Sequence, residues 1–263
     1  MEIVTRTDHA PRYTNNFIPT RRRDKQHRQA QPTVMEPIHR AAYDGNEGEV
    51  SRLVQEDGWP LDSQIQGDVR VDAWPVKGCT PLMLAAWKGH DAVVGRLIEL
   101  GVDVGLSDAG GQKAAHWACK GQSASALGLL LDAGASFNVR NDIGSTPLMC
   151  AAIWGATDCV EVLLARDGDA LVLDAQDSYR WTALHWAARQ EHSEIVQLLL
   201  LAGADPSIRN HEGHTPIDFP RSLNYQPCTA LLQAALAEPQ RPRLLLKARA
   251  LLDAARIRDV VGV

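Results

Sequence analysis

The chain has 263 residues, 45% of them hydrophobic, with 27 basic and 32 acidic side chains and a formal net charge of −5 at pH 7. This composition allows a sizeable core and argues against general affinity for nucleic acid. The longest apolar stretch, residues 198–204, is far shorter than the ~20 residues that span a bilayer, and the start lacks the apolar run of a secretory signal, so we expect neither membrane insertion nor export.

Residues 1–34 form a basic tail that we predict to be disordered. They carry seven basic and three acidic side chains and show no core pattern. The basic cluster at residues 21–25 fits a nuclear-import signal, but short clusters of this kind are commonly just solvated. Five cysteines without a C-x-x-C pair favour a reducing compartment. We therefore expect a cytoplasmic or nuclear protein.

One sequence pattern recurs six times after the tail. Examples are Thr-Pro-Leu-Met-Leu-Ala-Ala at 80–86 and Thr-Ala-Leu-His-Trp-Ala-Ala at 182–188. Three of the five intervals between copies are 33 residues long, and the other two, of 44 and 36 residues, contain insertions within 57–76 and 166–176. A fixed period of this length indicates a solenoid, in which insertions map to loops.

Each repeat predicts two short helices joined by a turn. A second apolar pattern with helical spacing follows each opening, as in residues 93–100 and 195–200. Threonines before the openings, Thr80 among them, predict helix caps, and the paired alanines predict close packing of neighbouring first helices. Glycines stand where the helices end, and they are Gly45, Gly89 and Gly155 for the first helix and Gly101, Gly134 and Gly203 for the second.

The Thr-Pro-Leu-His-x-Ala-Ala opening, the glycine between the helices and the Gly-Ala-Asp that precedes each hairpin resemble the ankyrin repeat. The resemblance covers residues 35–237 and implies an all-α ankyrin-repeat solenoid of about six helix-turn-helix repeats joined by hairpin loops. We place the repeats at 35–66, 75–107, 108–140, 141–176, 177–209 and 210–237.

Two repeats depart from the pattern. Glu191 replaces the glycine between the helices in the fifth repeat, where it is expected to strain the turn. Pro220 falls inside the first helix of the sixth repeat and is expected to cut that helix short.

Partners of ankyrin-like arrays contact the hairpin tips and the ends of the first helices, on the concave face. The residues at such positions here are Tyr43, Trp87, Lys88, Lys120, Ile153, Trp154, Tyr179, Trp181, Arg189, Gln190, His211 and His214. Exposed tryptophans beside cations favour a protein partner with an acidic surface and apolar anchors. The alternative is that Trp87 or Trp154 packs against a neighbouring tip. Trp117 and Trp186 lie inside the helix and are predicted to be core.

No residue pattern predicts catalysis, a cofactor or a metal. His39, His116 and His185 recur at one repeat position, and the resemblance implies that each bonds to the neighbouring loop. His211 and His214 form a local pair without a third ligand. Nucleophile elbows, phosphate loops and zinc-hydrolase motifs are missing from the sequence. We predict a non-enzymatic scaffold or adaptor, monomeric, that binds protein rather than nucleic acid or membrane.

Residues 238–263 predict an amphipathic C-terminal helix, with apolar residues at 244, 248, 251, 252 and 255. One interpretation is a cap on the last repeat, because solenoid ends need covering. The alternative is that the chain is a substrate-recruiting subunit of a larger enzyme complex such as a ubiquitin ligase, engaged through this helix. The segment lacks the cysteine and the Leu-Pro-rich piece of the recruitment box that follows some ankyrin arrays.

Overall fold

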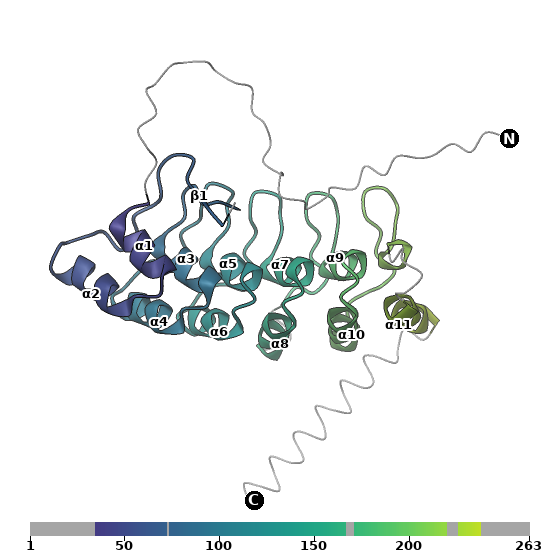
Figure 1. The fold of residues 1–263 in the computed structure, drawn as a ribbon. Helices are drawn as coiled ribbons and strands as arrows, with labels where there is room; N and C mark the ends of the chain where they lie inside the picture. Colours follow the sequence, from purple (N-terminus) through teal and green to yellow (C-terminus); the bar gives the residue numbers. More distant parts are fainter. Residues whose placement is uncertain (1–34, 73, 167–170, 220–225, 238–263) are drawn as a thin grey trace, which may run out of the picture.

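A computed structural model describes residues 35–72, 74–166, 171–219 and 226–237, which form two parallel rows of helices (Figure 1). The inner row consists of α1 (Pro37–Tyr43), α3 (Pro81–Lys88), α5 (Ala114–Lys120), α7 (Pro147–Trp154) and α9 (Ala183–Arg189). The outer row consists of α2 (Glu47–Gln55), α4 (Asp91–Glu99), α6 (Ala124–Asp132), α8 (Thr157–Ala165) and α10 (Ser193–Ala202). A short 3₁₀ helix η1 (Pro216–Asp218) and α11 (Gln226–Ala237) extend the two rows.

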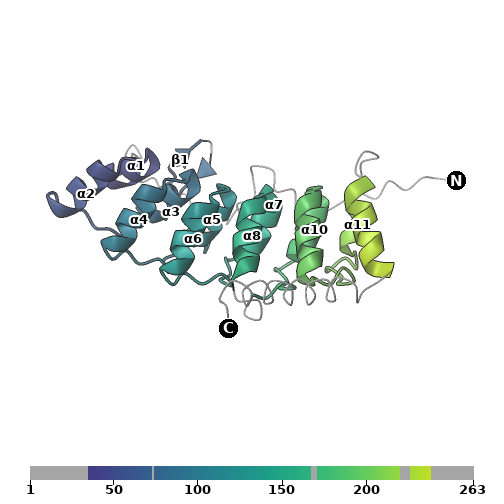
Figure 2. The same cartoon turned by 90° about the horizontal axis from the view of Figure 1, so that it is seen from below.

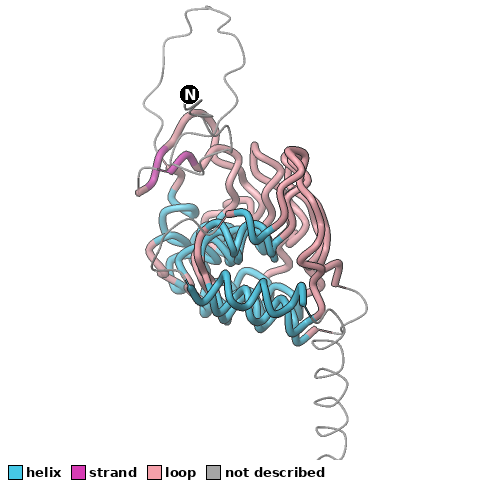
Figure 3. The backbone as a smooth tube through the Cα atoms, turned by 90° about the vertical axis from the view of Figure 1, so that its right-hand side faces the viewer, coloured by secondary structure: helices cyan, strands magenta, loops and turns pink. Residues whose placement is uncertain are grey.

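Neighbouring repeats stack in register, so each helix contacts its counterpart in the next repeat along both rows. Figure 2 shows the outer row from α2 to α11, and Figure 3 shows the loops rising away from the two helical rows. The prediction of an all-α solenoid is confirmed. Among the described residues, no helix combines the length and apolar character needed to cross a membrane.

The inner helices begin where the sequence places a threonine. The hydroxyl oxygens of Thr80, Thr146 and Thr182 accept hydrogen bonds from backbone N–H groups three residues later, at 3.4, 3.3 and 3.4 Å. Each cap satisfies a donor that the first helical turn leaves free. In the sixth repeat, Thr215 instead donates to the Asp218 carboxylate, and only a 3₁₀ turn follows. The first helix of this repeat is short, as predicted, while Pro220 itself lies outside the described residues.

The turn between inner and outer helix requires a left-handed backbone at one position. Gly45, Gly89 and Gly155 take φ values of +77°, +70° and +69° there, as predicted. Glu191 occupies the same position in the fifth repeat at φ +63°, so the expectation of a strained turn is confirmed. In the third repeat, the left-handed residue is Gln122 rather than Gly121.

Replacing Glu191 with glycine is expected to raise the free energy of unfolding by up to about 1 kcal/mol, because glycine adopts φ > 0 without a Cβ penalty. Gly155→Ala is the converse variant. Its Cβ would lie 2.8 Å from the His192 ring at φ +69°, so it is expected to lower stability by about 1 kcal/mol or more. Urea denaturation followed by circular dichroism measures both changes. Destabilisation by Glu191→Gly would contradict the strain argument.

Buried histidines tie three of the inner helices, α1, α5 and α9, to the loop of the following repeat. His39 Nε2 donates to the carbonyl oxygens of Ser63 and Cys79 at 2.9 and 3.1 Å. His116 donates to the Ser145 carbonyl at 3.0 Å, and His185 donates to the His214 carbonyl at 3.2 Å. All three side chains are fully buried, so these bonds satisfy backbone groups that water does not reach. The structural interpretation of the repeated histidine is confirmed.

Trp117 and Trp186 are buried, as predicted, and each indole holds the hairpin that precedes its helix. Trp117 Nε1 donates to Asp108 Oδ2 and Trp186 Nε1 donates to Asp177 Oδ2, both at 3.0 Å. The other oxygen of each carboxylate accepts backbone N–H groups of the hairpin. The hairpins whose helix carries Cys150 or Phe219 at the tryptophan position have Asn141 or Asn210 in place of the aspartate. The single side-chain oxygen of asparagine suffices in these hairpins, because neither Cys150 nor Phe219 has a side-chain N–H that needs a second acceptor.

The first insertion forms a loop, as predicted. Within it, β1 (Arg70–Val71) pairs antiparallel with β2 (Trp74–Pro75) in a two-stranded ribbon. Ile65, Val69 and Val76 are buried and anchor the base of the loop. The ribbon lies beside the ends of α3 and α5 (Figures 1 and 2). The tail at 1–34, residues 167–170 of the second insertion and the predicted helix at 238–263 lie outside the described residues.

Candidate interaction face

The C-terminal ends of the inner helices form one face of the solenoid, which we call the inner-helix face. Its residues come from the C-terminal ends of α1, α3, α5, α7 and α9, and they are Tyr43, Trp87, Lys88, Lys120, Trp154, Arg189 and Gln190. Because the repeats stack in register, side chains that are about 33 residues apart in sequence become neighbours in space. Large aromatic and cationic side chains gather in its N-terminal half.

Lys120 lies at the centre of a cluster of four tryptophans. Its Nζ is 3.9 Å from the ring centroid of Trp74, 4.1 Å from that of Trp117, 5.5 Å from that of Trp87 and 6.0 Å from that of Trp154. A cation over an indole face is attracted by the ring quadrupole, and more strongly where water is excluded. Burial lowers the pKa of Lys120 to about 8, because the rings replace water around the ammonium.

The tryptophans also contact one another. Trp74 meets Trp154 edge to face, with ring centroids 5.3 Å apart, and Trp87 meets Trp117 edge to face at 5.4 Å. Edge-to-face aromatic pairs add about 0.5–1.5 kcal/mol each to the stabilisation that comes from buried area. Trp87 and Trp154 are therefore half-buried by neighbouring rings. Packing against neighbours, the alternative that the sequence left open, does occur here, and part of each indole still faces solvent.

A second group of contacts centres on Asp72, at the tip of the ribbon. Its carboxylate Oδ2 accepts a hydrogen bond from the Tyr43 hydroxyl and lies 3.1 Å from Lys88 Nζ. These two donors lower the pKa of Asp72. The Lys88 ammonium also lies 4.8 Å from the Tyr43 ring centroid and 5.6 Å from that of Trp87. Lys88 is exposed, so a carboxylate from another chain can reach the same position.

The C-terminal half of the candidate set is less concentrated. The Arg189 guanidinium lies 5.5 Å from the ring centroid of Trp181, and Gln190 follows it at the end of α9. At the hairpin tips, His211 Nδ1 donates to the Tyr179 carbonyl at 2.9 Å, and the two rings lie 6.0 Å apart. This half of the face presents separate polar groups rather than one aromatic cluster.

Trp181 and Ile153 do not belong to the exposed face, so their prediction as partner-binding residues is wrong. Trp181 is fully buried, with its ring centroid 4.5 Å from those of both Trp186 and Phe219. It immediately precedes the Thr182 cap, where the chain turns inward from the hairpin tip to the helix. Ile153 is only 6% exposed because it lies one position before the solvent-facing Trp154 on α7.

Sequence reasoning did not place Asp72 and Trp74 on this face. Both lie in the first insertion, which has no repeat register from which a position in space follows. The signal that sequence does offer is their chemistry, since an indole in a polar surface loop is unusual unless it packs against something.

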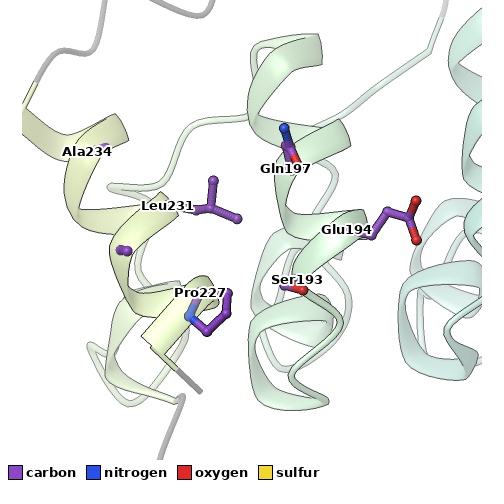
Figure 4. A pocket seen from close by; sticks show the side chains of 7 residues that line it. Ser193, Glu194, Gln197, Pro227, Leu231 and Ala234 are labelled. Atoms are coloured by element: carbon purple, nitrogen blue, oxygen red, sulfur yellow. The ribbon is translucent and has the colours of Figure 1, made fainter. Parts of the chain in front are cut away.

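Other candidate features lie away from the inner-helix face. Within the described residues, no group of three or more His, Cys, Asp or Glu side chains is arranged to hold a metal ion. His214 Nδ1 pairs with the Glu212 carboxylate at 3.3 Å. An open groove runs between α10 and α11, lined by Ser193, Glu194, Gln197, Pro227, Leu231 and Ala234 (Figure 4).

Stacked helix pairs, projecting loops and an aromatic and cationic face define a helical-repeat protein built for macromolecular recognition. A family model that describes three copies of the ankyrin repeat matches this chain in four overlapping segments, at residues 16–108, 93–174, 115–210 and 171–249. The chain therefore belongs to the ankyrin-repeat family, whose repeats bind other proteins.

Three curated relatives illustrate the range of the family. The human SH3 and multiple ankyrin repeat domains protein 2 is 32% identical over 162 residues, which cover 60% of this chain and 8% of that protein. The mouse Ankyrin repeat and SAM domain-containing protein 6 is 40% identical over 97 residues, which cover 36% of this chain and 10% of that protein. The human Ankyrin repeat and SOCS box protein 16 is 28% identical over 191 residues, covering 69% and 42%. The chain thus spans less than half the length of each relative.

Proposed function

We propose that this chain is an adaptor, without catalytic activity of its own, that binds a partner protein through the inner-helix face. The observation that carries the proposal is the convergence of Lys88 and Lys120 with several tryptophans on one side of the solenoid. Aromatic side chains beside cations are the residues that most often dominate binding energy at protein interfaces. Membership of the ankyrin-repeat family supports a protein partner rather than another ligand.

The proposed partner presents acidic groups and apolar anchors. Lys88 and Arg189 lie on the same face of a chain whose formal net charge is −5, so the face is locally cationic against an acidic background. Such a contrast attracts an acidic patch and orients it before contact. The tryptophan edges offer apolar area to side chains beside that patch. The alternative function, a ligase subunit engaged through residues 238–263, concerns a segment outside the described residues.

The test compares two triple variants of the full chain. The first, which we call the face variant, removes three cations from the inner-helix face by Lys88→Ala, Lys120→Ala and Arg189→Ala. The matched control, Arg52→Ala, Arg96→Ala and Arg166→Ala, removes three cations whose side chains pair with nearby acids away from that face. Exposed ion pairs of this kind contribute little to stability, so the control variant is expected to fold. Circular dichroism checks that both variants are folded before binding is compared.

We expect the face variant to bind the partner at least about tenfold more weakly and with a flatter dependence on salt, because each removed cation takes away an attraction that salt screens. The control variant is expected to bind like the wild type. Partners are recovered with the tagged wild-type protein and quantified by mass spectrometry, and dissociation constants are then measured at low and high salt. Equal binding by wild type and face variant would refute this location for the site.

A further inference from the structure

The tip of the β1–β2 ribbon rests on the inner-helix face and contacts four residues of the candidate site. Asp72 bonds to Tyr43 and Lys88, and Trp74 contacts Lys120 and Trp154. These contacts join an insertion between the first two repeats to helices α1, α3, α5 and α7. The ribbon therefore covers the N-terminal half of the surface on which the proposed function depends.

The two ribbon side chains divide the face into two subsites. The first accepts a carboxylate between the Tyr43 hydroxyl and the Lys88 ammonium. The second accepts a large aromatic ring, which lies over the Lys120 ammonium at 3.9 Å and against the edge of Trp154 at 5.3 Å. A carboxylate and an indole two residues apart in the ribbon fill both subsites together. The face thus holds an acidic residue and, two positions later, an aromatic one.

The ribbon tip and the ribbon base are held by separate contacts. Each strand is only two residues long, and a two-stranded ribbon of this size is not stable on its own. The base is fixed separately: Ile65 donates its N–H to the Cys79 carbonyl at 3.0 Å, and Val76 donates to the Val69 carbonyl at 3.0 Å. The tip can therefore leave the face while the buried base keeps its hydrogen bonds.

We propose that the ribbon tip is an internal mimic of the partner and competes with it for the inner-helix face. The partner would present an extended peptide segment with Asp or Glu followed two positions later by Trp, Phe or Tyr. This inference rests on the proposed function and narrows its partner class. The apparent affinity for the partner falls as the fraction of molecules whose face is occupied by the ribbon tip rises. The ribbon tip therefore raises the partner concentration that is needed for binding.

The test uses the full chain and a fluorescein-labelled peptide with the sequence of residues 68–76. The opened variant carries Asp72→Asn and Trp74→Ala, which remove the carboxylate charge from the first subsite and the ring from the second. Its matched control carries Asp68→Asn and Trp59→Ala, which remove the same chemical groups from other positions of the same insertion. Fluorescence anisotropy measures peptide binding, and a peptide with the same two changes as the opened variant serves as the negative probe.

We expect the opened variant to bind the peptide at least about tenfold more tightly than the wild type or the control variant does. Adding Lys88→Ala and Lys120→Ala to the opened variant is expected to abolish this gain. If the opened variant does not fold, the single Trp74→Ala variant is measured, and it is also expected to bind more tightly than the wild type. Peptide binding that is no tighter in the folded opened or single variant would overturn the proposal.

A second measurement separates this inference from the proposed function. Partner recovery that falls in the opened variant would show that the ribbon is a fixed part of the binding surface, which overturns the inference and leaves the adaptor function standing. Partner recovery that rises in the opened variant supports both. If the Lys88, Lys120 and Arg189 variant keeps both the partner and the wild-type affinity for it, that result counts against the proposed function, whatever the peptide-binding measurement gives.

Discussion

Replacing Gly121 with alanine is expected to lower the free energy of unfolding by about 3 kcal/mol, because the new methyl group collides with the backbone of the neighbouring repeat. A Cβ on Gly121 would lie 1.8 Å from the Trp87 carbonyl oxygen and 2.7 Å from its carbon. Backbone atoms at the end of a helix cannot rotate away as a long side chain can. The inner helices α3 and α5 would have to separate at the face that holds Trp87 and Lys120.

Gly128 provides the matched control for this prediction. It lies within α6, and a Cβ built there meets nothing within 4 Å. Gly128→Ala is therefore expected to raise stability by about 0.5–1 kcal/mol, since alanine is the better helix former and restricts the unfolded chain. Urea denaturation of both variants measures the two changes. A loss of stability as large for Gly128→Ala as for Gly121→Ala would mean that the close approach is not the cause.

The repeat period was enough to predict the architecture, because a solenoid repeats the same local contacts. The threonine caps, the buried histidines and most of the turn glycines follow from position within a repeat. The third repeat shows where this reasoning stops. There Gln122 takes the left-handed position, and the glycine, Gly121, stands one residue before it. Gly121 is needed at that place because its backbone closely approaches Trp87 of the neighbouring repeat. Only the distance between neighbouring repeats reveals that requirement.

The candidate face was predicted less completely than the fold. Its cations and half-exposed tryptophans, such as Lys88 and Trp154, occupy repeat positions whose direction the register determines. Trp181 was misplaced because it stands at the junction of hairpin and helix, where one residue separates solvent from core. Asp72 and Trp74 were missed because an insertion follows no period, so sequence spacing does not say which helices it will contact.

Acidification from pH 7 to pH 4.5 is expected to destabilise the fold through His116 and His185. Burial lowers the pKa of both imidazoles to about 4, from an ordinary value of 6.5. The unfolded chain therefore binds more protons than the folded chain between these values. The stability that the neutral histidines contribute is fully present above pH 6.5 and is lost as the pH falls toward 4. The loss is on the order of 2–3 kcal/mol per histidine, because one pKa unit corresponds to 1.36 kcal/mol.

Asp108 and Asp177 act in the opposite direction, since burial raises the pKa of each carboxyl and protonation then favours the folded state. A variant pair isolates the histidine contribution from theirs. His185→Gln is expected to be less stable than the wild type at pH 7 but to lose less stability on acidification, because glutamine does not titrate. The control variant is His214→Gln, which makes the same replacement of histidine by glutamine at the exposed tip of the last hairpin. Urea denaturation of each variant at pH 7 and pH 4.5 gives the differences, and an unchanged pH dependence in His185→Gln would assign the acid sensitivity to other groups.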